Sequence, residues 1–424
     1  MIGAIADDFT GATDVAVAFR RAGLRTVVFF GLPTADTHLP EHDAVVIGLK
    51  TRTIPADQAV EQSLAALRWL QSHRTEQFFF KYCSTFDSRP EGNIGPVADA
   101  LADHLGAGLT AVTPSSPEHG RTQYLGHLFV GGALLSDSPM SHHPLTPMTD
   151  SLIPRVLQAQ TTRPVSLVSH DVVRAGEPAI REELLRLRNG GVRYAVIDAV
   201  DDEDLVAIGR ACSAEILVTG AAGLAGGVGL VHAERLSSSR RPPNLDPVGE
   251  VPAVALAGSC SARTLEQIAV MAAHHDSYFL DAVAVPDSAE LARGALAWYD
   301  GRNSTASALI YSSVPADRLR MVQAELGVER ASAILEGALA EIARALVARG
   351  VRRLVIAGGE TSGAVVTALD VRGGLIGEEL APGVPWIYTV GEEPLALMLK
   401  SGNFGEPDLL LRAVSVRESE GQRA

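Results

Sequence analysis

Lysine is rare in this sequence of 424 residues. It occurs at three positions, Lys50, Lys81 and Lys400, whereas Lys and Arg together number 36. Lys81 lies at the end of an apolar run, where a charged side chain is costly unless it has a partner. The scarcity of lysine therefore makes Lys81 a candidate functional residue.

Cysteine and aromatic residues are also scarce, at three residues and 5% of the chain. Three cysteines without a close pair exclude a four-cysteine zinc site and fit a reducing, cytoplasmic location. No apolar run is long enough to span a membrane, and the first residues resemble a buried strand rather than a signal peptide. We therefore expect a cytoplasmic protein without a membrane partner.

Positive charge is deficient overall, since the formal net charge is −14. Such a chain lacks the positive footprint that duplex binding requires, so nucleic acid is not expected as a partner. An anionic small-molecule substrate would need local cations that overcome the unfavourable field of the whole chain.

The order of apolar runs predicts the fold class. Short apolar runs alternate with helical patterns such as residues 55–73, which is typical of βαβ units in an α/β fold. The runs predicted as strands are residues 1–6, 26–30, 44–49, 77–82, 110–114, 165–170, 194–199, 215–219, 253–257 and 353–357.

A chain of this length needs more than one core. Residues 236–252 contain Ser-Ser-Ser-Arg-Arg-Pro-Pro-Asn and further prolines, which is typical of a linker. We expect an N-terminal α/β domain over residues 1–236, a linker over 237–252 and a C-terminal α/β domain over 253–424. Each domain is expected to hold a mostly parallel sheet flanked by helices, with the active site in the cleft between them.

Two adjacent carboxylates, Asp7 and Asp8, follow the first predicted strand, and a helix opens near Thr10. Ligands bind at the carboxyl ends of strands in open α/β sheets. We therefore interpret this stretch as part of a binding site. A helix cap with two solvated acids is the alternative interpretation.

Polar residues also follow the next predicted strands. Arg52 comes just after residues 44–49, and a polar loop follows the strand that ends near Lys81. This loop, residues 81–95, contains Lys81, Ser84, Asp87, Arg89 and Asn93. Cations and hydroxyls together can hold a carboxylate and several hydroxyls, with arginine as a two-pronged donor. The alternative is a polar connection whose Ser and Asp side chains make local turns.

Two strand-to-helix turns rich in small residues mark the second half. Residues 258–261 (Gly-Ser-Cys-Ser) follow one predicted strand, and residues 358–363 (Gly-Gly-Glu-Thr-Ser-Gly) follow another, with a helix expected from Ala364. Open backbone N–H groups at such turns can bind phosphate, which the helix dipole also favours. A third turn, residues 402–405, could close the pocket. Ordinary loop chemistry is the alternative, and no Walker A motif is present.

Residues 142–150 form a loop with several prolines and two adjacent histidines, His142 and His143. A metal site is disfavoured, because no third ligand appears at metal spacing and neighbouring side chains on an extended segment point apart. We expect a substrate-lining or structural loop, and the metal ligands stay unknown.

As a set, four segments resemble the four-carbon acid sugar kinase family, and within it the 3-oxo-tetronate kinase branch. They are residues 6–12 (Ala-Asp-Asp-Phe-Thr-Gly-Ala), 81–95, 143–148 (His-Pro-Leu-Thr-Pro-Met) and 357–363 (Ala-Gly-Gly-Glu-Thr-Ser-Gly). Much of the wider family has a compact Asp-Ser-Thr-Leu-Arg-Gly-Asn run where this chain has residues 83–93. This departure leaves open which Asp or Ser here matches the shorter motif.

The resemblance implies an ATP-dependent kinase whose N-terminal domain binds a small sugar acid and whose C-terminal domain binds the nucleotide. It implies sugar-acid contacts near Asp8, Arg52, Lys81 and Asp87. It implies nucleotide contacts at Ser259, Gly359, Glu360, Thr361, Ser362 and Gly402. Together with the strand-end argument, we expect catalytic roles for Asp8, Lys81 and Asp87, and substrate contacts from Asp7, Thr10, Arg52, Ser84, Arg89 and Asn93.

The expected reaction transfers the γ-phosphoryl group of ATP to the 4-hydroxyl of 3-oxo-tetronate, with Mg²⁺ held by few protein ligands. Asp8, or else Asp87, would accept the hydroxyl proton. The alternatives are a D-threonate or D-erythronate 4-kinase, a phosphatase of the haloacid dehalogenase type, and a non-catalytic sugar-acid-binding protein. The sequence leaves open the stereoisomer and the formation of a homo-oligomer.

Overall fold

A computed structural model describes residues 1–34, 37, 39–143, 146–236, 246–249, 251–302, 306–391 and 393–415. The chain divides into two compact units, Met1–Pro243 and Asn244–Ala424, called here the N-terminal and C-terminal units. The predicted linker, residues 237–252, lies largely outside the described residues, as do Pro144 and Leu145 of the predicted loop.

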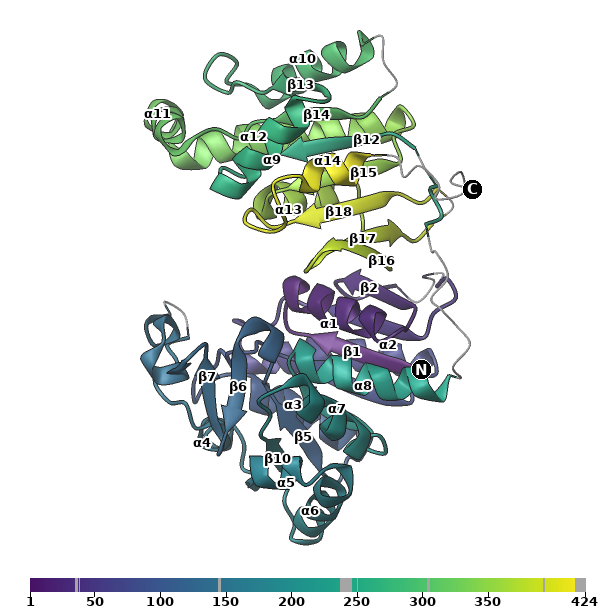
Figure 1. Cartoon of the computed structure of the whole chain (residues 1–424), viewed down its shortest axis with the longest axis vertical. Helices are drawn as coiled ribbons and strands as arrows, with labels where there is room; N and C mark the ends of the chain where they lie inside the picture. Colours follow the sequence, from purple (N-terminus) through teal and green to yellow (C-terminus); the bar gives the residue numbers. More distant parts are fainter. Residues whose placement is uncertain are drawn as a thin grey trace, which may run out of the picture. The chain divides into compact units, whose positions relative to one another are not determined.

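A parallel sheet forms the centre of the N-terminal unit (Figure 1). Its strand order is β2-β3-β1-β4-β11-β5-β10-β9. The strands are β1 (Ile2–Ala6), β2 (Thr26–Phe30), β3 (Ala44–Gly48), β4 (Gln77–Lys81), β5 (Thr110–Thr113), β9 (Val165–Val168), β10 (Tyr194–Ile197) and β11 (Leu217–Gly220). Their nearly continuous apolar sequences follow from burial on both faces of a parallel sheet.

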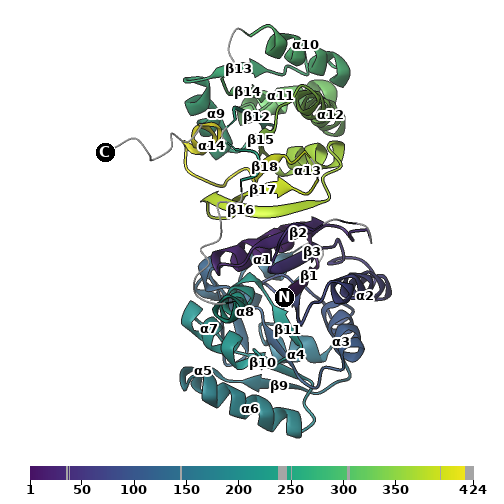
Figure 2. The same cartoon turned by 90° about the vertical axis from the view of Figure 1, so that its right-hand side faces the viewer.

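Helices cover both faces of this sheet (Figure 2). One face carries α1 (Phe9–Arg21), α7 (Asp202–Ala211) and α8 (Ala222–Arg235), and the other carries α2 (Ala56–Ser72) and α3 (Ile94–Leu105). The shorter or more peripheral helices are η1 (Pro117–His119), η2 (Leu135–Asp137), η3 (Pro139–His142), α4 (Ile153–Gln158), α5 (His170–Arg174) and α6 (Glu177–Asn189). This layering confirms the expected α/β class.

A small antiparallel sheet in the N-terminal unit was not expected from the sequence. It comprises β6 (Arg121–Tyr124), β7 (His127–Val130) and β8 (Ala133–Leu134). These strands are short and only partly buried. They therefore lack the continuous apolar run that identifies the central strands.

The C-terminal unit has a mixed sheet in the order β13-β14-β12-β15-β18-β17-β16. Strands β12 to β15 and β18 pair in parallel, whereas β17 runs antiparallel to both β16 and β18. The strands are β12 (Ala253–Ala257), β13 (Asp276–Phe279), β14 (Ala308–Tyr311), β15 (Arg353–Ala357), β16 (Gly373–Ala381), β17 (Val384–Thr389) and β18 (Ala396–Lys400).

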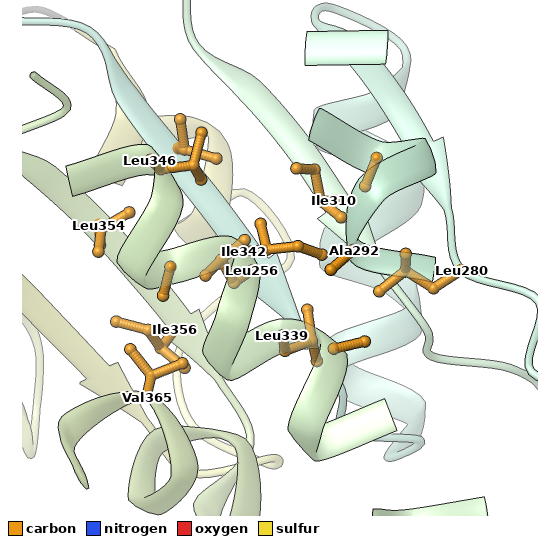
Figure 3. Close-up of a cluster of buried hydrophobic side chains, with 14 of the residues drawn as sticks. Leu256, Leu280, Ala292, Ile310, Leu339, Ile342, Leu346, Leu354, Ile356 and Val365 are labelled. Carbon is orange, nitrogen blue, oxygen red and sulfur yellow. The ribbon is translucent and has the colours of Figure 1, made fainter. Parts of the chain in front are cut away.

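The core of the C-terminal unit lies between this sheet and its helices. One face carries α9 (Ala262–Ala272) and α14 (Leu409–Val414), and the other carries α10 (Ser288–Asp300), α11 (Ala316–Leu326), α12 (Val328–Ala348) and α13 (Gly359–Ala368). Strand residues such as Leu256 and Ile356 pack against Leu339 and Ile342 of α12 (Figure 3). Such close-packed burial fixes the carboxyl ends of the strands, where the polar turns begin.

The helix expected from Ala364 begins five residues earlier, at Gly359. Gly358 is the single residue between β15 and α13, and its φ of 133° is one that residues with a side chain rarely adopt. Glu360, Thr361 and Ser362 therefore lie in the first helical turn rather than in a loop before the helix. This correction places their backbone N–H groups at the positive end of the helix dipole.

Candidate functional site

The carboxyl end of β1 carries two acids with different partners. Asp8 caps α1, since its Oδ1 accepts the Gly11 N–H at 2.8 Å. Asp7 is buried and accepts two hydrogen bonds from Arg52, from Nε at 2.9 Å and from Nη2 at 2.8 Å. The same Nη2 lies 2.8 Å from Asp8 Oδ1. One guanidinium group thus joins both acids.

The backbone after β3 holds Arg52 in this position. The N–H groups of Thr51 and Arg52 donate to the Asp7 carbonyl oxygen at 2.9 and 3.2 Å. The Asn93 side-chain amide donates to the carbonyl oxygens of Thr51 and Ile54 at 2.6 and 3.1 Å. Asn93, expected as a substrate contact, therefore uses its Nδ2 group to fix the loop that carries Arg52.

Lys81 is the last residue of β4, and its side chain is buried. A Cβ atom at Gly11 would lie 2.5 Å from Lys81 Nζ and 2.5 Å from Asp8 Oδ1. The amine and the carboxylate therefore converge on the one position of α1 that has no side chain. Glycine allows this approach because it has no Cβ atom.

The loop after β4 brings a further acid to this cluster. Thr85 Oγ1 donates to Asp87 Oδ1 at 2.6 Å and lies 2.9 Å from Cys83 Sγ. Burial raises the pKa of the Cys83 thiol, and the charge of Asp87 raises it further while that of Arg52 lowers it. Asp87 and Arg52 therefore act on the same thiol, and Cys83 is a member of the cluster that sequence reasoning did not include.

The side chains of three other expected substrate contacts form no hydrogen bond or ion pair with this cluster in the part of the chain that the structure describes. Thr10 is exposed on the first turn of α1, Arg89 is exposed, and Ser84 is half-buried. Exposure leaves them accessible to a ligand but gives no geometric argument for their predicted roles.

Asp14 is a residue of this region that sequence reasoning did not single out. It lies on α1, three residues after Gly11, and therefore on the same side of the helix. Burial raises the pKa of Asp14, while the charges of Lys81 and His119 lower it. Its spacing from Gly11 was the available sequence signal.

A cavity of about 390 Å³ lies in the C-terminal unit, at the carboxyl ends of β12 to β15. Its polar wall is made of two chain turns, formed by Gly258, Ser259, Gly358, Gly359, Glu360 and Thr361. Its apolar wall includes Leu280, Val314, Leu319, Val322, Leu335 and Leu339. A pocket of this size that combines an apolar wall with polar groups is typical of a small-molecule site.

The first turn of α13 offers backbone donors to this cavity. No side chain caps α13. A Cβ atom at Gly258 would clash with Thr361 Oγ1, so glycine is required for the two turns to approach. Ser362 Oγ is buried and has no hydrogen-bond partner in the described part of the chain. Uncapped N–H groups at a helix N-terminus are typical anion ligands.

The third glycine turn, residues 402–405, lies against the first, residues 258–261. A Cβ atom at Gly402 would lie 2.5 Å from Ser259 Oγ. The Gly402 carbonyl oxygen accepts from Ser261 Oγ at 2.6 Å, Thr264 Oγ1 at 2.8 Å and Lys400 Nζ at 2.9 Å. The turn expected to close the pocket therefore lies against Ser259, which lines it.

The two halves match two domain models of one family. A sugar-binding N-terminal domain matches residues 2–228, and a nucleotide-binding C-terminal domain matches residues 254–410. The chain is 49% identical over 420 residues to a 3-oxo-tetronate kinase of Cupriavidus necator, covering 98% of this chain and 96% of that protein. The chain belongs to the four-carbon acid sugar kinase family. Within this family, it falls in the 3-oxo-tetronate kinase branch.

Other members of this family agree with the assignment. A 3-oxo-tetronate kinase of Pseudomonas fluorescens is 48% identical and covers 98% of this chain and 96% of that protein. A crystal structure of a Haemophilus influenzae protein is similar with a TM-score of 0.90 and 41% identity, covering 97% of this chain and 98% of that one.

The acid and cation cluster and the cavity lie in different halves of the chain. The acid and cation cluster lies within residues 2–228, and the 390 Å³ cavity lies within residues 254–410. In the described ranges, no group of three or more His, Cys, Asp or Glu residues could hold a metal ion. None of the helices in those ranges has the length and apolar character that crossing a bilayer requires.

Proposed function

We propose that this chain is an ATP-dependent kinase that phosphorylates the 4-hydroxyl of 3-oxo-tetronate. Its relatives named 3-oxo-tetronate kinase cover nearly the whole chain at 42% to 49% identity. The observation that carries the proposal is the presence of two complementary sites in one chain. One gathers cations and acids at strand ends, and the other lines a cavity with glycine turns and an uncapped helix.

The N-terminal cluster would bind the sugar acid. Lys81 offers a compact cation for the substrate carboxylate or for the transferring phosphoryl group. Arg52 offers a planar guanidinium that Asp7 and Asp8 already orient. We keep Asp8, Lys81 and Asp87 as the proposed catalytic group, with substrate contacts from Asp7, Thr10, Arg52, Ser84, Arg89 and Asn93.

The cavity of the C-terminal unit would bind ATP. The N–H groups of Gly359, Glu360 and Thr361 would hold phosphate oxygens, because the dipole of α13 favours negative charge there. The buried Ser362 hydroxyl, the Ser259 hydroxyl and the Gly402 turn would complete this end of the site. The apolar wall would accept the base, and the charged Asp281 and Arg318 side chains that also line the cavity pair with one another.

Mg²⁺ fits the donors of this cavity. Glu336 and Glu360 both line it. Burial raises the pKa of Glu336, and the charge of Glu360 raises it further, so the two carboxylates act on one another. Mg²⁺ is usually bound by one or two carboxylates together with substrate phosphates and water, so these two residues would hold it. Once bound, the ion would neutralise charge that develops on the phosphate oxygens.

Catalysis by these residues would consist mainly of positioning and charge stabilisation, because the phosphoryl transition state is loose and anionic. Lys81 would stabilise charge beside the acceptor, and the α13 amides would stabilise the departing diphosphate. The three cysteines are free, which supports a cytoplasmic location. A homo-oligomer stays a prediction.

The test is an ADP-release assay with purified protein, ATP, Mg²⁺ and one sugar acid at a time. We expect stoichiometric ADP release with 3-oxo-tetronate, and much lower kcat/KM with D-threonate, L-threonate and D-erythronate. Preferred use of a threonate or erythronate would assign the chain to one of those kinases instead. Release of inorganic phosphate from a sugar-acid phosphate without ATP would indicate a phosphatase, and sugar-acid binding without ADP release would indicate a binding protein.

A further inference from the structure

The acids first expected to accept the substrate proton already hold strong donors. Asp7 binds Arg52 through both oxygens, and Asp8 Oδ1 holds both the Gly11 N–H and the Arg52 guanidinium. Asp87 Oδ1 accepts the Thr85 hydroxyl. Carboxylate oxygens that already accept these donors are less available to a substrate hydroxyl. These acids are therefore placed to hold the cluster together.

Asp14 occupies a different position at the same cluster. It follows Gly11 by three residues on α1, so it lies on the side of the helix where Lys81 Nζ and Asp8 Oδ1 converge. Four charged groups act on it. They are Asp8 at the start of α1, Lys81 at the end of β4, Arg52 after β3 and His119 at the end of η1.

The environment of Asp14 also favours proton uptake. Burial is the largest influence on this carboxyl, and it raises the pKa against the opposing charge of Lys81. Within the described ranges, the Asp14 carboxylate makes no hydrogen bond or ion pair, in contrast to those of Asp7 and Asp8. A general base is most effective when its pKa approaches the working pH and its lone pairs are available.

We propose that Asp14 is the general base of the reaction, and this inference rests on the proposed kinase function. The 4-hydroxyl oxygen forms a bond to the γ-phosphorus as the bond from that phosphorus to the bridging oxygen of ADP breaks. The electron pair of the broken bond stays on ADP. The hydroxyl proton moves to the Asp14 carboxylate and then to solvent. The Lys81 amine stabilises the anionic oxygens.

The experiment compares Asp14→Asn with the wild-type enzyme and with Asp57→Asn, an exposed acid on α2. For Asp14→Asn, we expect kcat to fall by roughly 10²- to 10⁴-fold, with the KM for ATP and the thermal unfolding midpoint nearly unchanged. The wild-type kcat should fall at acid pH as one group is protonated, and Asp14→Asn should lose this acid limb. His119→Gln should keep the limb, because His119 only modulates the field at Asp14.

Several outcomes would overturn the inference. A folded Asp14→Asn enzyme with kcat within about threefold of wild type would do so, since loss of the base must cost far more. So would loss of the acid limb in Asp8→Asn together with its retention in Asp14→Asn. If Asp14→Asn does not fold, Asp14→Ser replaces it, and a wild-type kcat and acid limb in that variant contradict the inference, because serine cannot accept the proton at this pH. Failure of the kinase proposal is distinct, because the wild-type enzyme itself would then release no ADP.

Discussion

Lys400 Nζ donates to the Gly402 carbonyl oxygen at 2.9 Å, and this bond ties the third glycine turn to the end of β18. The same amine donates to Thr264 Oγ1 at 2.9 Å and to Gln267 Oε1 at 2.6 Å, both on α9. None of these partners is a carboxylate, although Lys400 is 1% exposed. Burial, followed by the charge of Arg263, lowers the pKa of Lys400 to about 8.

This arrangement predicts that Lys400 positions the nucleotide site without contacting the sugar acid. Lys400→Met should remove one donor from the Gly402 and Thr264 oxygens and leave the Gln267 Oε1 atom without its lysine donor. A buried oxygen that loses its donor typically costs about 1–3 kcal/mol. Because Gly402 abuts Ser259, we expect ADP to bind roughly 10-fold more weakly or worse. Calorimetric titration of ADP and the KM for each substrate test this expectation.

Lys50→Met is the matched control, since Lys50 is an exposed lysine of the N-terminal unit. It should leave ADP affinity unchanged. If Lys400→Met binds ADP as tightly as this control does, the predicted positioning role is wrong. A raised KM for the sugar acid with normal ADP affinity would contradict it as well.

The geometry of Arg52 predicts that its substitution affects use of the sugar acid and leaves ADP binding unchanged. Arg52→Lys keeps the charge but cannot make the two parallel bonds to Asp7. Burial alone would lower the pKa of Arg52, yet the hydrogen bonds and charge of Asp7 raise it overall, so the pair depends on this geometry. We expect kcat/KM for 3-oxo-tetronate to fall roughly 10- to 100-fold, as for other loosened clamps, with ADP affinity preserved.

The control for this variant is Arg68→Lys, an exposed arginine on α2. It should behave as the wild-type enzyme in steady-state assays and in ADP titrations. Equal kcat/KM values for the Arg52 and Arg68 variants would show that the paired geometry at Asp7 is not needed.

Local sequence patterns predicted the strands of the N-terminal central sheet, strands β12 and β15 of the C-terminal unit, and part of the N-terminal cluster. Strands β2 and β15 have the expected bounds, because unbroken apolar runs end at residues that break strands. The rule that ligands bind at strand ends brought Asp7 and Asp8 together with Arg52, and the structure joins these three.

Other features depend on contacts between distant residues and could not be read from local patterns. Lys400 and its partner Thr264 are 136 positions apart in the sequence. The Asn93 amide is committed to carbonyl oxygens about 40 positions away. The early start of α13 depends on the φ of Gly358, which its sequence neighbours do not reveal. Pairing of this kind is decided by tertiary packing rather than by local preference.

The buried position of His232 predicts that the protein loses stability at acid pH. Its Nε2 lies 2.8 Å from Gln77 Oε1, and burial, followed by the charge of the amino terminus, lowers the pKa of His232 to about 4. Between pH 6.5 and about 4, the unfolded chain binds a proton at this residue that the folded chain does not. The free energy of unfolding therefore falls as the pH falls through this window, by about 3 kcal/mol at most.

Urea titrations of His232→Gln and wild type at several pH values test this prediction. The variant should lose less stability between pH 6.5 and 4, because glutamine does not titrate there. His104→Gln, an exposed histidine substituted in the same way, should follow the wild-type curve. Parallel curves for His232→Gln and wild type would contradict the prediction.

The substitution Gly11→Ala should lower activity while leaving the stability of the fold nearly unchanged. In Gly11→Ala, the new Cβ would lie 2.5 Å from both Asp8 Oδ1 and Lys81 Nζ. Both atoms end flexible side chains, so they can move away without disturbing the backbone, although the move weakens the bond by which Asp8 caps α1. Alanine favours a helix by up to about 1 kcal/mol over glycine, which offsets that loss. We therefore expect an unfolding midpoint close to that of the wild type.

The displaced amine and carboxylate should nevertheless impair the reaction, because shifts of about 1 Å in catalytic groups can cost roughly 100-fold in rate. We expect kcat/KM for 3-oxo-tetronate to fall on this scale, with ADP binding unchanged. Gly132→Ala is the control, since a Cβ there would meet no atom within 4 Å. Wild-type kcat/KM in Gly11→Ala would mean that the convergence of Lys81 and Asp8 on Gly11 has no part in catalysis.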